Sequence, residues 1–177
     1  MEDTKNPLPG KIAMNYGILL GIILILISVI MYITGMALEG KQWPMYIYYL
    51  IFPVVIIFAI KDYKNKNNDF LTLSDALKTG VATGVISALM FLAYNLIFNY
   101  IIEPTYSEQI IDKTRDTMSE MSELTSEQIE TSLKFVKWLS NPLLGGAIWL
   151  ALSAFFSLIY SLIAGLIMKN KNPYEEA

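Results

Sequence analysis

Four long runs without a charged residue constrain this chain more than any other feature of its sequence. The runs are 27, 19, 24 and 31 residues long and cover residues 12–38, 42–60, 79–102 and 138–168. All 13 basic and all 16 acidic residues of the 177-residue chain lie outside them. A soluble helical domain of this size needs charged side chains on the outer face of nearly every helix. The sequence therefore predicts an integral membrane protein.

Each run is long enough to cross a bilayer as a helix, because ~20 apolar residues at about 1.5 Å per residue span the ~30 Å hydrocarbon core. We expect one all-α membrane domain over residues 1–177, with residues 103–141 forming an extracytoplasmic helical hairpin between the third and fourth spans. The first run exceeds the ~7–15-residue apolar core of a signal peptide and has no small-x-small cleavage site after it, so we interpret it as a retained helix. The expected spans are about 15–36, 44–60, 78–102 and 142–168.

Capping patterns predict where the helices outside these runs begin. Thr105 and Thr125 are each followed three residues later by Glu or Gln, which predicts helices near 106–122 and 126–139. Ser74 is the expected cap of the third span. Both loop helices carry a narrow apolar stripe that suits contact with the other helix, with the bilayer surface or with a partner. The stripes consist of Ile110, Thr114, Met118 and Met121, and of Ile129, Leu133 and Val136.

The distribution of Lys and Arg predicts the orientation of the chain. With four spans, both termini and the 61–78 loop share one side, which carries eight of the 13 basic residues. The other side carries five, and its 103–137 segment also holds eight acidic residues. Cytoplasmic segments are enriched in Lys and Arg. We therefore expect both termini in the cytoplasm.

Small residues gather on one half of the first, third and fourth spans when these are projected at 100° per residue. In lipid, helices associate through close approach at small residues and through a few polar contacts, so we expect the small half to face protein. Bulky residues such as Ile86, Met90 and Trp149 would then face lipid, and the seam on the first span would continue to Gly35. The expected helix-packing residues are Gly17, Gly21, Gly80, Gly84, Ser153, Ser157, Ser161 and Gly165.

Asn95 and Asn99 are the most polar side chains deep in any span, and they lie one turn apart on the same face. Since buried amides need partners, we interpret them as an interhelical clamp with a serine or a backbone carbonyl. Contact with a ligand or an ion is the alternative. For the serines of the fourth span we favour hydrogen bonds back to their own helix, with a polar pathway as the alternative.

The residue types that are missing exclude several kinds of chemistry. The chain has no His and no Cys, so it lacks imidazole and thiolate ligands, a His base and a Cys nucleophile. The runs hold no carboxylate, Lys or Arg, which disfavours proton- or ion-coupled transport. A net charge of −3 without a basic stripe argues against nucleic acid. We expect no catalytic, cofactor-binding or metal site; the acids of 120–130 have no ordered oxygen-ligand spacing.

Four segments carry a resemblance to a known family. They are Tyr16-Gly17 at the start of a Leu/Ile-rich helix, Phe70–Gly80, the stretch from Tyr94-Asn95 to Glu103-Pro104, and Ser126–Ile129. Over about residues 14–168 the chain resembles the small integral membrane proteins of the uncharacterised family numbered 4199 among the domains of unknown function, typical of Bacteroidota. This resemblance implies a four-helix protein of a Gram-negative inner membrane, with residues 103–141 in the periplasm. It implies no activity and no catalytic residues.

Three classes of function are compatible with these observations. We favour a non-enzymatic accessory or scaffold subunit that contacts membrane lipid and binds another membrane protein or a second copy of itself. The alternative is a small permease or channel component with a polar path along the third and fourth spans, lined by Asn95, Asn99 and the serines. An enzyme acting on lipid is disfavoured because neither a general base nor a metal site is available.

Overall fold

The computed structural model describes residues 8–121 and 124–170, and the named elements within them are all helices. Four of these are long and apolar enough to cross a membrane: α1, α2, α6, and α3 together with the π-helical turn η1 that continues it. The predicted all-α class with four candidate spans is therefore confirmed. The elements are α1 (Pro9–Ile33), α2 (Trp43–Lys66), α3 (Leu73–Ile97), η1 (Phe98–Ile102), α4 (Tyr106–Ser119), α5 (Ser126–Leu139) and α6 (Pro142–Met168).

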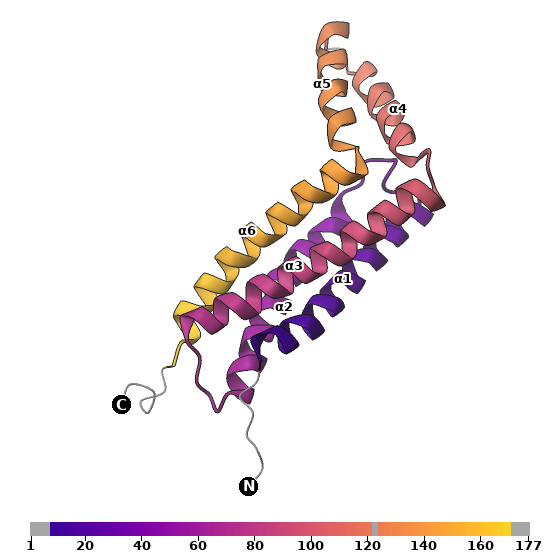
Figure 1. The fold of residues 1–177 in the computed structure, drawn as a ribbon. Helices are drawn as coiled ribbons and strands as arrows, with labels where there is room; N and C mark the ends of the chain where they lie inside the picture. Colours follow the sequence, from indigo (N-terminus) through magenta and orange to yellow (C-terminus); the bar gives the residue numbers. More distant parts are fainter. Residues whose placement is uncertain (1–7, 122–123, 171–177) are drawn as a thin grey trace.

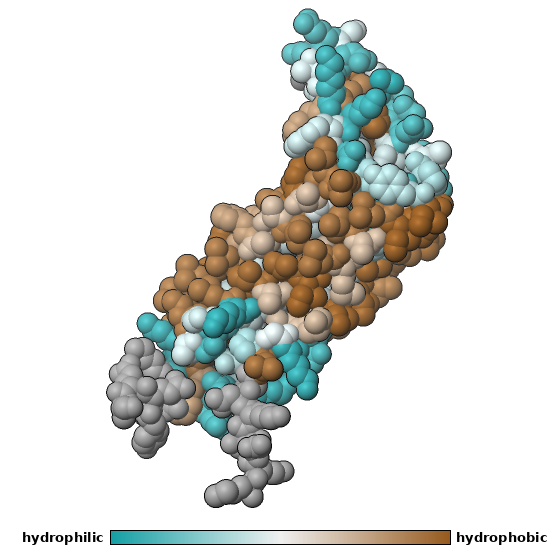
Figure 2. All heavy atoms as spheres, viewed as in Figure 1, coloured by the Kyte–Doolittle hydropathy of each residue, from teal (hydrophilic) through white to brown (hydrophobic). Residues whose placement is uncertain are grey.

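Helix α3 is the centre of the bundle. It packs along α6 on one side and along α1 on the other, while α2 contacts all three of these helices (Figure 1). Helices α4 and α5 contact each other and extend from one end of the bundle. Figure 2 shows hydrophobic residues over the middle of the molecule and hydrophilic residues at both ends. This distribution is the one expected of a bundle that crosses a bilayer.

Three of the long helices extend beyond the spans expected from the apolar runs. Helix α1 begins at Pro9, α2 continues to Lys66, and α3 begins at Leu73. The apolar run marks the part of a helix that can lie in hydrocarbon, but backbone hydrogen bonding continues where charged side chains reach water. Helix α4 ends at Ser119, and position 122, the predicted end, lies outside the described residues.

The prediction for Gly35 is wrong. Helix α1 ends at Ile33, so Gly35 lies in the turn that follows and not in a helical seam. Its φ of +72° is in the left-handed region, which glycine adopts without the steric cost that a Cβ brings. Gly35 therefore helps to terminate α1 instead of packing it.

One of the three predicted caps forms, and two do not. Thr125 Oγ1 accepts a hydrogen bond from Gln128 N (3.3 Å) and Gln128 Oε1 accepts one from Thr125 N (2.9 Å), so this capping box is confirmed. Thr105 already has helical backbone angles, and its hydroxyl forms no cap. Helix α3 is capped by Thr72, whose Oγ1 accepts from the backbone of Asp75, and not by Ser74.

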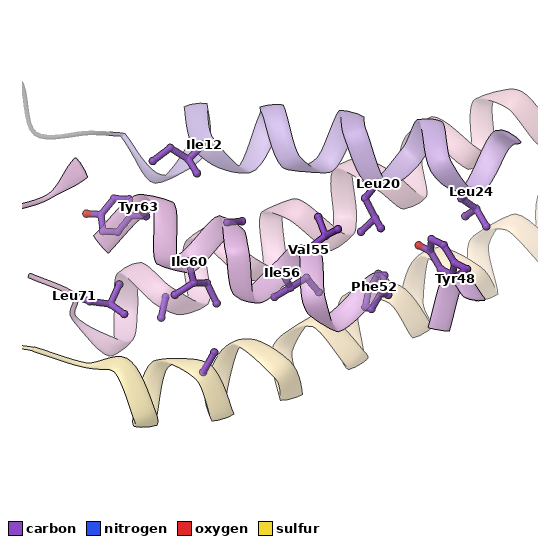
Figure 3. Close-up of a cluster of buried hydrophobic side chains, with 13 residues drawn as sticks. Ile12, Leu20, Leu24, Tyr48, Phe52, Val55, Ile56, Ile60, Tyr63 and Leu71 are labelled. Atoms are coloured by element: carbon purple, nitrogen blue, oxygen red, sulfur yellow. The ribbon is translucent and has the colours of Figure 1, made fainter. Parts of the chain in front are cut away.

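The apolar core is centred on α2, which supplies more of its buried residues than α1, α3, α6 or the α2–α3 loop. Figure 3 shows Leu20 and Leu24 of α1 pointing toward Tyr48 and Phe52 of α2. Leu71, in the α2–α3 loop, is fully buried in the same cluster. Its backbone also exchanges two hydrogen bonds with Asn170, of 2.8 and 2.9 Å. The α2–α3 loop is thereby attached to the end of α6.

Glycines bring α3 close to both of its neighbours. A Cβ added to Gly84 would lie 2.6 Å from Ser157 Cβ of α6, and one added to Gly17 of α1 would lie 2.7 Å from Ile86 Cβ. Met90 contacts the position of Gly21 in the same way. The expectation that Ile86 and Met90 face lipid is therefore wrong. Since α3 has neighbours on two sides, its bulky half is covered by the glycine seam of α1.

Candidate functional site

The two intramembrane asparagines lie at the end of the bundle from which α4 and α5 extend. Asn99 is 8% exposed; its Nδ2 donates to the carbonyl of Asn95 (2.9 Å), and its Oδ1 accepts from Ser107 Oγ of α4 (3.1 Å). Ser107 Oγ is also 3.0 Å from the carbonyl of Ser140, so its single proton has two possible acceptors. Asn99 thus joins η1 to α4. The Asn95 side chain is half-buried and makes no hydrogen bond to any described residue.

A π-helical turn positions Asn99. In η1 the backbone N–H of Glu103 bonds to the carbonyl of Phe98 at 2.8 Å, five residues earlier. Such turns are wider than an α-helical turn and occur frequently at functional sites. Pro104 follows directly, and a residue before proline is disfavoured in the helical region. Glu103 accordingly leaves the helix with φ −137° and ψ 75°.

The two asparagines line a cavity of about 250 Å³ between α3, η1, α4 and the start of α6. We call it the amide cavity. Its polar side chains are amides and hydroxyls, and its walls include aromatic rings. None of the described residues that line it carries a charge. Its lining includes Asn95, Asn99, Tyr106, Ser107, Asn141 and Trp149.

A carboxylate beside the amide cavity fastens α4 to the bundle. Glu103 accepts hydrogen bonds from Thr105 Oγ1 (2.6 Å), Tyr32 Oη (3.0 Å) and Gln109 Nε2 (3.3 Å). These donors, Thr105 first and then Tyr32, hold the pKa of Glu103 below its usual range because they favour the ionised form. The Tyr32 ring also lies edge-on to Tyr106, with 5.6 Å between the ring centroids. Helices α1 and α4 are joined at this point.

A second, apolar cavity of about 390 Å³ lies between α2 and α6. We call it the aromatic groove. Trp149 lines it as well as the amide cavity. The expectation that Trp149 faces lipid is wrong, because its half-buried ring lies 5.8 Å from the Tyr48 ring and 5.9 Å from the Phe91 ring. The groove is lined mainly by Tyr48, Tyr49, Phe52, Trp149, Phe156 and Tyr160.

The serines of α6 are buried against α3. Ser157 Oγ donates to the carbonyl of Ala154 (3.0 Å), and Ser161 Oγ donates to the carbonyl of Ser157 (2.5 Å). Ser161 contacts the position of Gly80, and Gly165 packs against Ala76. On α3, Thr83 and Ser87 likewise bond to carbonyls of their own helix. These four hydroxyls are thus satisfied within their own helices, whereas Thr79 Oγ1 of α3 is buried without a partner among the described residues.

The α4–α5 pair is held by a small apolar contact and by ionic interactions. Leu133 is its one buried side chain among the described residues, and the remaining stripe residues other than Met121 are half-buried. Arg115 Nη2 lies 3.8 Å from Glu130 Oε1 across the pair. On the outside of α5, Phe135 and Trp138 stack with their centroids 6.1 Å apart and are 61% and 49% exposed. Among the described residues, no group of three acidic side chains is placed to hold a metal ion.

Comparison with known protein families gives one match. Residues 15–170 match the family described as "Protein of unknown function (DUF4199)". The chain belongs to this family. The curated proteins and the solved structures that were compared contain no match. Because the description of DUF4199 assigns no activity, the function of this member must be argued from its own residues.

In this DUF4199 protein, sequence reasoning identified only part of the cavity lining. Asn95 and Asn99 were recognisable as polar residues inside an apolar run. Tyr106 and Ser107 were not, because they follow the run and reach the cavity only when α4 folds back beside η1. Trp149 was assigned to the wrong side. Its position on the border between the small and bulky halves of α6 was the signal that it touches two neighbours.

Proposed function

We propose that this protein is a non-enzymatic scaffold or accessory subunit of a bacterial inner membrane, which binds another membrane protein or a second copy of itself. The α3–α6 contact is the observation that carries the proposal. Its serine side chains pack directly on its glycines, and the hydroxyls of Ser157 and Ser161 are bonded to carbonyls of their own helix. Small polar residues in this arrangement serve helix packing. The sequence has no His and no Cys, so a His base and a thiol nucleophile are both lacking, which supports a non-enzymatic role.

The permease alternative would use the same face as a polar path along α3 and α6. A path needs hydroxyls that are free to contact solute and a space between the helices. Here Ser157 and Ser161 are fully buried against glycines of α3. The packing observed in a single chain therefore favours the scaffold.

We further propose that α4 and α5 form a periplasmic hairpin, with both termini in the cytoplasm. The lysines at the end of α2 (Lys61, Lys64 and Lys66) and Lys78 near the start of α3 support this orientation, since these ends of the two helices lie opposite the hairpin. The termini themselves, residues 1–7 and 171–177, lie outside the described residues. The exposed Phe135–Trp138 stack on α5 is the element that we assign to partner binding, because exposed aromatic pairs are typical anchors of interfaces.

Co-purification from native membranes in mild detergent tests this proposal. The full chain should retain a stoichiometric membrane protein or a second copy. A variant with residues 107–132 replaced by a short Gly-Ser linker should lose it, because this change removes α4 and the first half of α5, the helix that presents Phe135 and Trp138. Phe135→Glu should have the same effect as the deletion. Lys134→Glu is the matched control, because it adds an acid at the neighbouring position, about 100° around the helix.

A chain that purifies alone and monodisperse would contradict the scaffold proposal. Loss of the partner by Phe135→Glu and Lys134→Glu alike would contradict the assignment of the aromatic stack. Solute flux by the purified chain in liposomes, abolished by Asn95→Leu, would establish the permease instead.

A further inference from the structure

One continuous face of α6 lines both the amide cavity and the aromatic groove. The lining positions recur every three or four residues from Pro142 through Trp149 to Tyr160. At 100° per residue they all lie within about 60° of Trp149. At about 1.5 Å per residue this face is ~27 Å long, which is close to the ~30 Å thickness of a hydrocarbon core. The two cavities therefore meet at the Trp149 ring and follow the same helix into the membrane.

The amide cavity contains hydrogen-bonding groups without partners. Asn95 makes no side-chain hydrogen bond within the described residues, and Trp149 Nε1 is buried without an acceptor. Ser107 Oγ can donate its single proton either to Asn99 Oδ1 or to the carbonyl of Ser140, so one of these two acceptors is left without this hydrogen bond. Buried polar groups are normally satisfied, and unpaired ones are costly. A ligand with both donors and acceptors would satisfy the groups in this cavity.

The chemistry of the two linings indicates what kind of ligand fits. Neither cavity has a charged residue among its described lining residues, and transfer of an unpaired phosphate into such a site is costly. The groove is lined mainly by aromatic side chains and lies between two of the candidate membrane spans, so we expect it at the depth of the acyl chains. The cavity lies at the start of α6, one end of a candidate span, so we expect it near the headgroups. The two together match a molecule with an uncharged polar end and an apolar tail.

We propose that this face of α6 binds a single lipid with an uncharged, hydrogen-bonding headgroup. The headgroup occupies the amide cavity, where Asn95 contacts its hydroxyl or carbonyl oxygens and the Trp149 ring forms part of the wall. One acyl chain follows the aromatic groove between α2 and α6. This site does not depend on the scaffold role, because none of its lining residues belongs to the Phe135–Trp138 stack.

Quenching of Trp149 fluorescence by brominated lipid tests the site. The chain has three tryptophans, so Trp43→Phe and Trp138→Phe leave Trp149 as the reporter. The protein is reconstituted in phosphatidylcholine vesicles that contain a small mole fraction of diacylglycerol with dibrominated acyl chains. This probe should quench Trp149 saturably and several-fold more than dibrominated phosphatidylcholine at the same mole fraction. Asn95→Leu should reduce the quenching to the phosphatidylcholine level.

Tyr100→Leu is the matched control, because it makes a comparable change on an exposed residue at the same end of α3, outside both cavities. It should leave the quenching unchanged. Asn95→Leu removes no hydrogen bond of the Asn95 side chain, and circular dichroism should show unchanged helix content. Equal quenching by the two brominated lipids would show that the groove contacts bulk lipid without selectivity, and would overturn the proposal. Preferential quenching by brominated phosphatidylglycerol would contradict the assignment of an uncharged headgroup. Weak quenching by all three lipids would mean that protein covers the groove, and would also overturn it.

Discussion

At Gly84 and Ser157 the backbones of α3 and α6 approach so closely that an added Cβ would have no room. The same holds at Gly17, where α1 meets Ile86 of α3. In a bilayer, burial of apolar side chains does not drive helices together, because lipid tails are equally apolar. Close packing of the two backbones stabilises the contact instead. The size of single residues therefore controls the stability of this bundle.

We expect Ser157→Leu to destabilise the bundle by about 1–3 kcal/mol, because the larger side chain overpacks a contact with α3 that has no free space. Ile163→Leu, on an exposed position of the same helix, should change the free energy of unfolding by less than about 0.5 kcal/mol. Unfolding in mixed micelles with increasing dodecyl sulfate, followed by circular dichroism, measures both values. Equal tolerance of the two substitutions would show that the α3–α6 contact is not tight.

Sequence projection separates small from bulky residues, but it cannot say how many neighbours a helix has. The assignment failed at Ile86, Met90 and Trp149 for this reason. Ile86 and Met90 lie opposite Gly17 and Gly21 of α1, where the missing glycine side chains leave room for these bulky residues of α3. Trp149 reaches both α2 and α3. Such complementary pairs become visible only when two helices are aligned in space.

At the level of the helices, hydroxyl residues before a helix have competing partners. Thr125 is extended (φ −78°, ψ 156°) and caps α5. Thr105 has the same sequence pattern, but it follows Pro104 and lies two residues after Glu103. Its hydroxyl donates a hydrogen bond to the Glu103 carboxylate at 2.6 Å. The capping pattern was therefore sufficient for α5 and insufficient for α4, since the carboxylate is not part of the pattern.

Thr125→Ala should destabilise the start of α5 by about 1 kcal/mol, the usual cost of losing a side-chain N-cap. Hydrogen exchange measured by mass spectrometry should show faster exchange in the first turn of α5. Ser126→Ala serves as the control, because Ser126 is exposed and its hydroxyl makes no hydrogen bond to a described residue, so the first turn of α5 should exchange as before. Equally fast exchange in this turn after Ser126→Ala would contradict the role of the Thr125 cap.

For the whole molecule, the membrane class and the number of candidate spans followed directly from the charge-free runs. The arrangement around α3 and the amide cavity did not. The cavity combines Asn95 of α3, Ser107 of α4 and Trp149 of α6, and these residues come together only through the turn at η1 and the return of the chain through α5. Hydropathy indicates whether a helix lies in lipid or in water, but it contains no information on which helices pack against each other.

The orientation of the molecule is expected from its basic residues, with the α2–α3 loop in the cytoplasm and the α4–α5 pair in the periplasm. Because the chain has no cysteine, single cysteines report without background. Ser126→Cys and Asn65→Cys place thiols at exposed positions near opposite ends of the molecule.

In intact spheroplasts a membrane-impermeant maleimide should label the Ser126→Cys variant and leave the Asn65→Cys variant unlabelled. Both should react after detergent permeabilisation, which controls for thiol reactivity. Labelling of the Asn65→Cys variant alone in intact spheroplasts would reverse the topology and place the hairpin in the cytoplasm.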